Sequence, residues 1–388
     1  MQITGNWLHH PGTQALCAAL TAQGFQALLV GGCVRNALLG LPVSDLDLCT
    51  DARPEIVSDI AKNAGFKVIP TGIDHGTLTI IAGHRAHEVT TFRRDIDTDG
   101  RHATVAFSTD IAQDAARRDL TINALYARAD GTVLDPLGGL PDLLARRVRF
   151  VGDATQRIRE DYLRILRFFR FHAHFADPAG GMDAEALAAC AANLDGLDGL
   201  SRERVGQEMR KLLAAADPAP AVAAMAQTGV LGALLPGADP YGLAPLVHLE
   251  ADLPADWRRR LVVLGGQDLA ERLKLSRVEA RDIAALTAAL SSMDTPAALG
   301  FALGADLGVS AVLARAVILE APLPKTWQAE VSRGSKALFP VKAADLPHLS
   351  GPALGKHLKS LQTLWLNTGL SASKADLLAA PLPGSALN

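Results

Sequence analysis

The chain has 388 residues, of which 49% are hydrophobic, 20% charged and 5% aromatic, and its formal net charge is -3. This length predicts roughly two to four domains of about 100–200 residues each. The slightly acidic balance excludes a protein that coats nucleic acid through bulk positive charge, and the few aromatic residues argue against a broad base-stacking surface.

Strand and helix patterns alternate over roughly the first 150 residues, which predicts a mixed α/β region. In chain order, strands are expected at 27–30, 45–49, 67–69, 77–82, 87–92 and 132–134, and helices at 34–39, 54–63 and 114–127. The segments 77–82 and 87–92 alternate like the two strands of a hairpin. Residues 93–105 have no apolar period and are expected to form a mobile loop.

Helical patterns replace the strand signal after about residue 151, where Ala-, Leu- and Arg-rich segments are separated by turns that contain Pro and Gly. We therefore expect an α+β chain whose mixed sheet is followed by an all-α region. Boundaries near 151, 215 and 320 divide it into the segments 1–150, 151–215, 216–320 and 321–388.

Targeting and redox signals are sparse. The four cysteines, Cys17, Cys33, Cys49 and Cys190, form no CxxC pair and no zinc-site spacing, which is typical of free thiols in a reducing cytoplasm. No basic region followed by an apolar core opens the sequence, and no stretch of about 18 apolar residues lacks charge. We expect a cytoplasmic protein with neither a signal peptide nor a membrane span.

A carboxylate pair, Asp45 and Asp47, lies in a predicted strand, where residues two apart project from the same face. Such a pair is suited to one or two Mg²⁺ ions, because hard cations take oxygen ligands. Two ions clamp the attacking and leaving oxygens of a phosphoryl displacement. Glu88 is the best candidate for a third carboxylate. The alternative is three solvated surface acids, since a DxD pattern alone is weak evidence.

A glycine turn, Gly31-Gly32, follows the first predicted strand and opens a helix. Backbone N–H groups at such a turn form an anion nest, and Arg35 lies one turn into the helix, within reach of a phosphate. The alternative is a strand–helix turn that merely requires glycine, because the pattern is neither GxGxxG nor a Walker A loop. A phosphate nest followed by paired carboxylates suggests nucleotidyl transfer.

The segment RRDLTINALYA begins a predicted helix with Arg117, Arg118 and Asp119, and Asn123 follows one turn later. An Asp near a helix N-terminus is a normal capping residue. Arg118 is a candidate ligand for a triphosphate held at the glycine turn.

A charged helix is predicted over RIREDYLRILRFFRF, residues 157–171, whose polar face carries Arg157, Glu160, Asp161, Arg164 and Arg167. Arg170 falls on the side opposite Asp161, so it requires a bend in the helix or serves a phosphate. Cytosine and adenine present an amino donor where guanine and uracil present a carbonyl. An Asp161 acceptor beside an Arg164 or Arg167 donor therefore matches C and A. The alternative is a surface helix with ion pairs.

Five motifs occur in order over about residues 25–215: GGCVRNALLG with DLD, RRDLTINALYA, DPLGGLPDL, REDYLRILRFFRF and SRERVGQEMRKLL. In this order they resemble the class II tRNA CCA-adding enzyme and poly(A) polymerase family. The resemblance implies a polymerase-beta-like nucleotidyltransferase head, a neck that selects the base, and a helical body and tail that hold tRNA. These parts correspond to the four predicted segments.

The resemblance also implies functions for single residues. Gly32 and Arg35 are expected to contact the nucleotide, Asp45 and Asp47 to hold Mg²⁺, and Arg118 to contact the triphosphate. The neck pattern DxxRxxRxxR matches Asp161, Arg164, Arg167 and Arg170. Asp161 and Arg164 would read the base. The chain departs from the family at Asn36, where an Asp is usual, and this removes a charge near the glycine turn.

Several activities are compatible with this family. The stretch GIDHGTLTIIAGHRAHEV carries few basic residues, which favours CCA addition to tRNA from CTP and ATP over poly(A) synthesis. Addition of only C or only A stays open, as does the oligomeric state. A non-catalytic RNA-binding protein is the remoter alternative, because the DLD motif is intact. No HD dipeptide occurs, so we expect no phosphohydrolase domain.

Basic clusters in the second half are candidates for phosphate contacts along one arm of an RNA. They are Arg202, Arg204, Arg210 and Lys211, then Arg258, Arg259 and Arg260, then Arg272, Lys274, Arg277 and Arg281, and finally Lys356 and Lys359. The alternative is solvated helix faces, which is the more usual reading of such runs.

Overall fold

The computed structural model describes residues 1–73, 76–99, 102–251 and 253–380. It consists of two compact units. Unit 1 contains Met1–Leu212 and Pro220–Leu234, and unit 2 contains Leu213–Ala219 and Leu235–Asn388. The four segments expected from the sequence are finer than this division and stay a prediction.

Within the described residues, unit 1 has a seven-stranded mixed sheet in the order β3-β4-β5-β2-β1-β8-β9. The strands are β1 (Leu28–Val30), β2 (Asp47–Thr50), β3 (Lys67–Gly72), β4 (Thr77–Ala82), β5 (Arg85–Thr91), β8 (Tyr126–Ala127) and β9 (Val133–Leu134). β4 and β5 pair antiparallel, as the predicted hairpin requires. β2 and β5 pair in parallel, which brings the strand that carries Asp47 beside the strand that carries Glu88.

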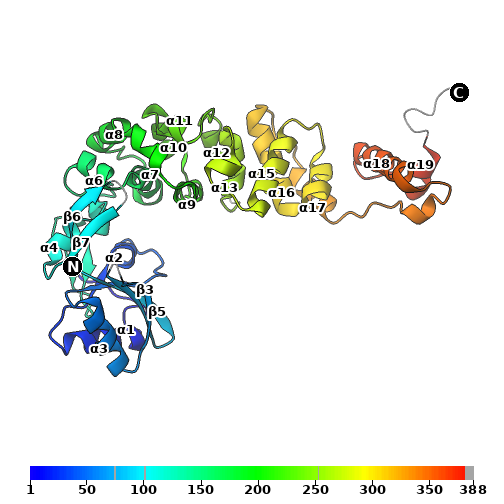
Figure 1. Cartoon of the computed structure of the whole chain (residues 1–388). Helices are drawn as coiled ribbons and strands as arrows, with labels where there is room; N and C mark the ends of the chain where they lie inside the picture. Colours follow the sequence, from blue (N-terminus) through cyan, green and yellow to red (C-terminus); the bar gives the residue numbers. More distant parts are fainter. Residues whose placement is uncertain (74–75, 100–101, 252, 381–388) are drawn as a thin grey trace. The chain divides into compact units, whose positions relative to one another are not determined.

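Helices α1 (Pro11–Thr21) and α3 (Pro54–Asn63) pack against strands β3–β5 of this sheet (Figure 1). Each has proline in its first turn, where the missing N–H has no helical partner to lose. α2 (Gly32–Leu38) follows β1, and Gly40, at φ +68°, comes just after its end. Buried Leu28, Val30, Cys49, Phe92 and Tyr126 form part of the core on which these elements meet.

The prediction of a loop over residues 93–105 is wrong. The chain forms β6 (Arg93–Asp99) and β7 (His102–Phe107), which pair antiparallel as a separate two-stranded sheet. Pairing between two strands uses backbone N–H and C=O groups, so it does not depend on an apolar period in the sequence. The expected strand at 45–49 is also displaced, because β2 begins only at Asp47.

The predicted helix over residues 114–127 is wrong as well. Helix α4 (Ile111–Ala116) ends at Ala116, inside the predicted range. A 3-10 turn then spans Thr121–Asn123, and the chain continues into β8. Asp119 accepts hydrogen bonds from the Leu120 N–H (2.8 Å) and the Asn123 amide (3.2 Å). Such local side-chain bonds compete with helix formation. Arg117, Arg118 and Asp119 therefore follow a helix and do not open one.

The predicted helix over residues 157–171 is two helices, α6 (Ala154–Glu160) and α7 (Leu163–Phe175). Asp161 is extended, at φ -156° and ψ 105°, and its Oδ1 accepts the Leu163 N–H at 3.1 Å. The helix is interrupted at Asp161, so residues 157–171 do not share one helical wheel. The argument that placed Arg170 on the side opposite Asp161 therefore does not apply. Unit 1 also contains α5 (Leu140–Leu144) upstream and α8 (Ala184–Ala191) and α11 (Val230–Leu234) downstream. It contains α9 (Arg202–Leu213) and α10 (Ala219–Gln227) as well, except for Leu213 and Ala219, which belong to unit 2.

Unit 2 is helical in its described residues, with α12 (Leu243–Glu250), α13 (Trp257–Leu264), α14 (Leu269–Arg272), α15 (Arg277–Leu290), α16 (Pro296–Ile318), α17 (Trp327–Ser335), α18 (Gly351–Asn367) and α19 (Lys374–Ala379). α16 and α17 pack so closely that there is no room for a side chain at two glycines. A Cβ on Gly300 would clash with the Val331 carbonyl, and one on Gly334 with the Ala297 carbonyl. A second apolar cluster surrounds Trp365 of α18.

Among the described residues, α16 alone is long and apolar enough to cross a membrane by length and composition. However, 56% of its most apolar window is buried inside the fold. Gly304, at φ +82°, also interrupts the helical backbone, so the segment is two shorter helices joined at a kink. Both features indicate a core helix.

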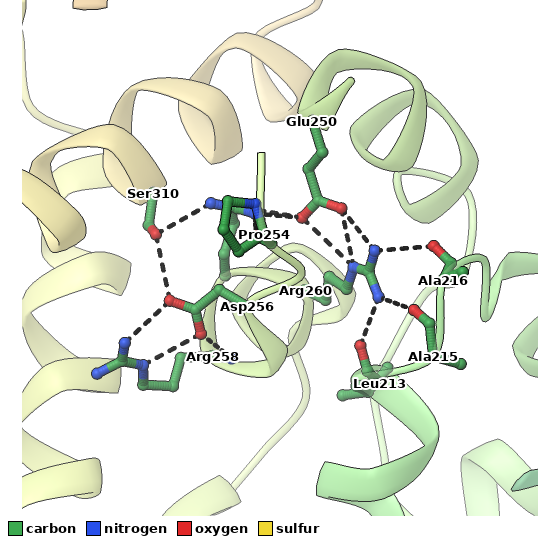
Figure 2. Close-up of polar contacts among 10 residues, drawn as sticks. Leu213, Ala215, Ala216, Glu250, Pro254, Asp256, Arg258, Arg260 and Ser310 are labelled. Carbon is green, nitrogen blue, oxygen red and sulfur yellow. Dashed lines mark hydrogen bonds and ion pairs between the residues drawn. The ribbon is translucent and has the colours of Figure 1, made fainter. Parts of the chain in front are cut away.

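Much of the WRRRL run is buried in unit 2. Figure 2 shows the polar contacts of Arg258 and Arg260. Arg259 and Arg260 are 3% and 2% exposed, and both donate to the carboxylate of Glu250, at 2.7 and 2.6 Å. Arg260 also donates to the backbone carbonyls of Leu213, Ala215 and Ala216. The prediction that this run contacts RNA is therefore wrong for Arg259 and Arg260, because their guanidiniums are buried and fully engaged.

Candidate active site

The predicted carboxylates gather where β2 and β5 pair. Asp47 begins β2 and lies directly opposite Glu88 of β5, and paired residues of parallel strands share a face. Asp45 precedes the strand and is exposed, with its Oδ2 accepting from Ser44 Oγ at 3.1 Å. Burial, followed by the charge of Glu88, raises the pKa of Asp47 to about 6, Asp45 adds to this, and Arg118 acts in the opposite direction.

This donor set fits a divalent cation. Three carboxylates within electrostatic reach of one another, one of them half-buried, provide hard oxygen ligands and an excess of negative charge. The described residues contain no group of three or more His, Cys, Asp or Glu side chains already placed to hold one ion together. The structure thus places Asp47 beside Glu88, while Asp45 is exposed just before the strand.

Arg118 lies at the glycine turn and is held there by two residues that sequence reasoning missed. Its Nε donates to the Tyr126 hydroxyl at 3.1 Å and its Nη2 to Asp114 at 3.0 Å, while the Tyr126 hydroxyl donates to Asp114 at 2.8 Å. Asp114 and Tyr126 are both buried. The Nη1 atom of Arg118 is 3.5 Å from the point where a Cβ of Gly31 would lie. The four-residue spacing of Asp114 and Arg118 was the available signal.

The glycine turn itself requires glycine at its first position. Gly31 has φ +70°, a left-handed conformation that side chains disfavour, and it precedes α2, which begins at Gly32. The N–H of Gly31 donates to the Leu125 carbonyl at 3.1 Å, which ties the turn to the segment leading into β8. That N–H is therefore committed within the protein.

Arg35 is expected to contact a nucleotide, but the structure gives its guanidinium protein partners. The side chain is buried, its Nη1 donates to Asn123 Oδ1 at 2.5 Å, and its Nε and Nη2 donate to Asn36 Oδ1 at 3.1 and 2.8 Å. The guanidinium also stacks over the Phe175 ring at 4.1 Å. Burial, followed by the charge of Arg170, lowers the pKa of Arg35 to about 10.

Asn36 has a structural reason to be an amide. Its Oδ1 accepts from Arg35, and its Nδ2 donates to the Pro42 carbonyl at 2.9 Å. An Asp at this position accepts hydrogen bonds but has no donor for Pro42 when it is ionised. Asn36 thus forms a bridge between Arg35 and the turn after α2.

The residues of the neck pattern are linked to partners on other elements. Arg167 donates to Asp119 at 2.6 Å and Arg170 to Glu208 at 2.6 Å. Asp161 accepts from Arg204 of α9, also at 2.6 Å. Burial alone would lower the pKa of Arg167. The charge of Asp119 and its hydrogen bond outweigh burial and raise this pKa, with smaller contributions from Glu208 and Asp161. Asp161, Arg167 and Arg170 therefore belong to one charged cluster.

The guanidinium of Arg164 makes its hydrogen bonds outside that cluster. Its Nη1 donates to Glu160 at 2.6 Å and to the Arg157 carbonyl, and its Nη2 donates to the Arg117 carbonyl. Sequence reasoning also missed Arg204 and Glu208 as partners of the neck. Their four-residue spacing in SRERVGQEM, on one face of a helix, was the signal that could have found them.

Comparison with known proteins gives two family matches. Residues 27–149 match the poly A polymerase head domain, and residues 181–241 match the probable RNA and SrmB-binding site of polymerase A. A CCA-adding enzyme of Geobacillus stearothermophilus is 34% identical over 371 residues, which cover 89% of each chain. The chain belongs to the tRNA CCA-adding enzyme and poly(A) polymerase family. The crystal structure of Bacillus stearothermophilus CCA-adding enzyme in complex with CTP has a TM-score of 0.73 and 31% identity, over 92% of each chain.

Other relatives in the family match over a shorter range. The mitochondrial CCA tRNA nucleotidyltransferase 1 of Homo sapiens is 44% identical over 203 residues, which cover 52% of this chain and 47% of that protein. The alignment thus spans about half the length of this relative. The family's mixed sheet followed by helices agrees with the α+β class predicted from the sequence, which is confirmed.

Proposed function

We propose that this chain adds CCA to the 3′ end of tRNA by template-free nucleotidyl transfer from CTP and ATP, with release of pyrophosphate. The observation that carries the proposal is the pairing of Asp47 with Glu88 beside Arg118, in the same unit as the Asp161 cluster. Relatives named CCA-adding enzyme and CCA tRNA nucleotidyltransferase, and a similar structure determined with CTP, support this reaction.

Asp45 and Asp47, with Glu88 as the third carboxylate, would hold Mg²⁺. When bound, the metal would supply Lewis-acid chemistry that favours attack by the tRNA 3′-hydroxyl on the α-phosphorus. The raised pKa of Asp47 supports this role, because a carboxylate crowded by other carboxylates gains most from a nearby cation. No side chain becomes covalently modified in the reaction.

Arg118 would bind the phosphates at the turn formed by Gly31 and Gly32. Its bonds to Asp114 and Tyr126 fix the guanidinium before the nucleotide arrives, so little side-chain entropy is lost on binding. Arg35 would support this site indirectly, since its donors are used by Asn36 and Asn123.

Asp161 would select the base by accepting a hydrogen bond from the amino group of cytosine or adenine. Guanine or uracil would instead bring a carbonyl oxygen against the carboxylate, and two acceptors repel each other. Arg167 lies in the same cluster and would donate to the ring. Arg164, the other proposed base reader, would first have to leave Glu160 and the Arg117 carbonyl. Arg170 would hold the cluster in place through Glu208.

Phosphate contacts to tRNA would come from exposed cations of unit 2, such as Lys356 and Lys359 of α18 and Arg277 and Arg281 of α15. We place the protein in the cytoplasm, because its four thiols are free and buried, as is usual in a reducing compartment. The printed name of the human relative is mitochondrial, so a fluorescent fusion in the source cell is the direct check.

The decisive experiment gives the purified chain a tRNA transcript that lacks CCA, with Mg²⁺ and each nucleotide separately or together. We expect two C additions from CTP, one A addition when ATP is also present, and none from UTP or GTP. Asp47→Ala is expected to abolish incorporation, while Asp59→Ala, an exposed acid on α3, serves as the matched control. Unchanged incorporation by Asp47→Ala contradicts the metal assignment.

The name of the matching head domain favours poly(A) synthesis as a second candidate function. Transcripts that end in C, CC or CCA separate the possibilities. Long A tails on the CCA transcript would identify a poly(A) polymerase. A single A on the CC transcript with no use of CTP would identify an enzyme that adds only A.

A further inference from the structure

Each carboxylate oxygen of Asp161 accepts a hydrogen bond from the protein. Oδ1 accepts the Leu163 N–H at 3.1 Å, and Oδ2 accepts Arg204 Nη2 at 2.6 Å. The first bond comes from the backbone at the start of α7 and fixes the direction of the carboxylate. The second comes from a side chain on α9, 43 residues further along the chain. A base that donates to Oδ2 of Asp161 must therefore share this oxygen with Arg204 or displace it.

Helix α9 contacts the neck at two points that differ in depth. Glu208 pairs with Arg170, and both side chains are nearly buried, at 7% and 14% exposure. Arg204, one turn earlier, is 41% exposed and its partner Asp161 is 28% exposed. A half-exposed guanidinium regains water when it leaves its partner, so breaking the outer pair costs little. Breaking the inner pair strands a buried charge and costs much more.

We infer that Arg204 is an internal competitor of the nucleotide base, because its guanidinium occupies the acceptor on Asp161 that the amino group of cytosine or adenine would take. The inference rests on the proposed function, in which Asp161 reads the base. Arg204 holds Asp161 ready as an acceptor and is displaced when C or A binds. Glu208 keeps α9 in place during this exchange.

The competition acts on cytosine and adenine only. An amino group replaces the N–H donor of Arg204 at Oδ2, so the exchange conserves the number of hydrogen bonds. The carbonyl of uracil or guanine has no proton to donate and cannot replace Arg204. Removal of Arg204 is thus expected to help the two correct bases and to leave the two wrong bases as they are.

The test measures binding of CTP, ATP, UTP and GTP to the full-length chain in Mg²⁺ by isothermal titration calorimetry, without tRNA. For Arg204→Met, we expect the Kd for CTP and ATP to fall by roughly two- to fivefold, the range for a half-exposed ion pair, with no gain for UTP or GTP. Lys62→Met removes an exposed cation from α3, in the same unit, and is expected to leave the Kd for CTP unchanged.

A second experiment tests whether the effect of Arg204→Met on the Kd for CTP depends on Asp161. In an Asp161→Asn protein, adding Arg204→Met is expected to change the Kd for CTP by less than twofold. Arg204→Gln keeps an uncharged donor and is expected to give a smaller gain than Arg204→Met, and thermal melts check that each variant is folded. A Kd for CTP that rises or stays the same in Arg204→Met overturns the inference. If the wild type binds CTP no better than UTP, the proposed function itself fails.

Discussion

Two arginine-rich runs look alike in the sequence but have different surroundings in the folded chain. In α7, Arg167 is 33% exposed and bonds to Asp119, 48 residues away. In α13, Arg259 and Arg260 are 3% exposed or less and share Glu250. Figure 2 shows the bonds between Arg260 and Glu250. A guanidinium in contact with water can exchange its partner for a ligand, whereas a buried one cannot leave without stranding a charge. Depth and partner, more than the run of arginines, distinguish a recognition site from a core.

The largest expected effect is on stability, and it comes from breaking the buried ion pairs of Arg259 and Arg260 with Glu250. Glu250→Gln removes the charge that two buried guanidiniums share, and we expect it to destabilise unit 2 by about 3–5 kcal/mol. Urea unfolding followed by circular dichroism measures the change. CTP binding, which we assign to unit 1, is expected to persist under conditions in which the variant stays folded.

The matched control for Glu250→Gln is Arg281→Gln. Arg281 pairs with Asp282 at 3.2 Å, but its side chain is 75% exposed, so we expect a change within about 0.5 kcal/mol. Equal stability of the two variants would show that burial does not separate the two kinds of arginine.

The next effect tests the cluster in unit 1. Asp119→Asn removes the partner of Arg167, and we expect it to cost about 1–3 kcal/mol and to relax the choice between CTP and UTP. Burial alone would raise the pKa of Asp119, but the charge of Arg167 outweighs it and holds this pKa below its usual range. The stabilisation is therefore complete above the ordinary pKa near about 3.9 and is lost as the pH falls through the folded value.

Acid unfolding and nucleotide competition measure these two consequences separately. The exposed Asp198→Asn is the control for a lost carboxylate in unit 1. Asp119→Asn is expected to show a flatter loss of stability below pH 4 than the wild type. An acid transition as steep as that of the wild type would mean that Asp119 does not stabilise the cluster.

A smaller effect concerns Asn36 at the edge of the same cluster. Asn36→Asp gives Arg35 an ionic partner but loses the donor to Pro42, so we expect a change of about 1 kcal/mol or less, in the stabilising direction. Asn36→Leu loses both bonds and is expected to cost about 1–2 kcal/mol. Thermal melts measure both variants side by side, and an Asn36→Asp protein less stable than Asn36→Leu would contradict this account.

The last effect depends on pH and lies away from both arginine runs, at the buried His87 of β5. Its Nε2 bonds to Thr13 Oγ1 at 2.9 Å, and burial lowers its pKa, with Arg85 and His10 as minor repulsive charges. The unfolded chain then takes up a proton that the folded chain refuses, so stability falls as the pH drops below about 6.5, by at most about 1.4 kcal/mol per pH unit. His87→Gln is expected to reduce this slope between pH 7.5 and 5.5, and an unchanged slope would exclude His87 as its source.

Local patterns predicted the elements whose stability is mainly local. Helix Pro54–Asn63 and strand Thr77–Ala82 were predicted with their observed bounds, because a proline start, an amphipathic period or strict alternation specifies them. Patterns failed at 93–105, 114–127 and 157–171. In the last two segments, side-chain bonds of Asp119 and Asp161 to the backbone interrupt the helix that the periodicity favours.

The candidate site divides in the same way. The sequence predicted Asp45, Asp47, Glu88, Arg118 and the neck pattern as site residues from their types and spacings, and these functions stay predictions. It did not single out Asp114, Tyr126 or Glu208, and it named Arg204 as an RNA-phosphate candidate and not as the partner of Asp161.

The sequence by itself determined the family, the α+β class and the residue types of the site, because these depend on composition, order and spacing. Only the tertiary structure decided which charges face one another. It paired Asp47 with Glu88 across two strands, turned Arg35 onto Asn36, and placed Arg204 on Asp161. The physical reason is that an ion pair or hydrogen bond depends on distance and burial in space, and neither is encoded by separation along the chain.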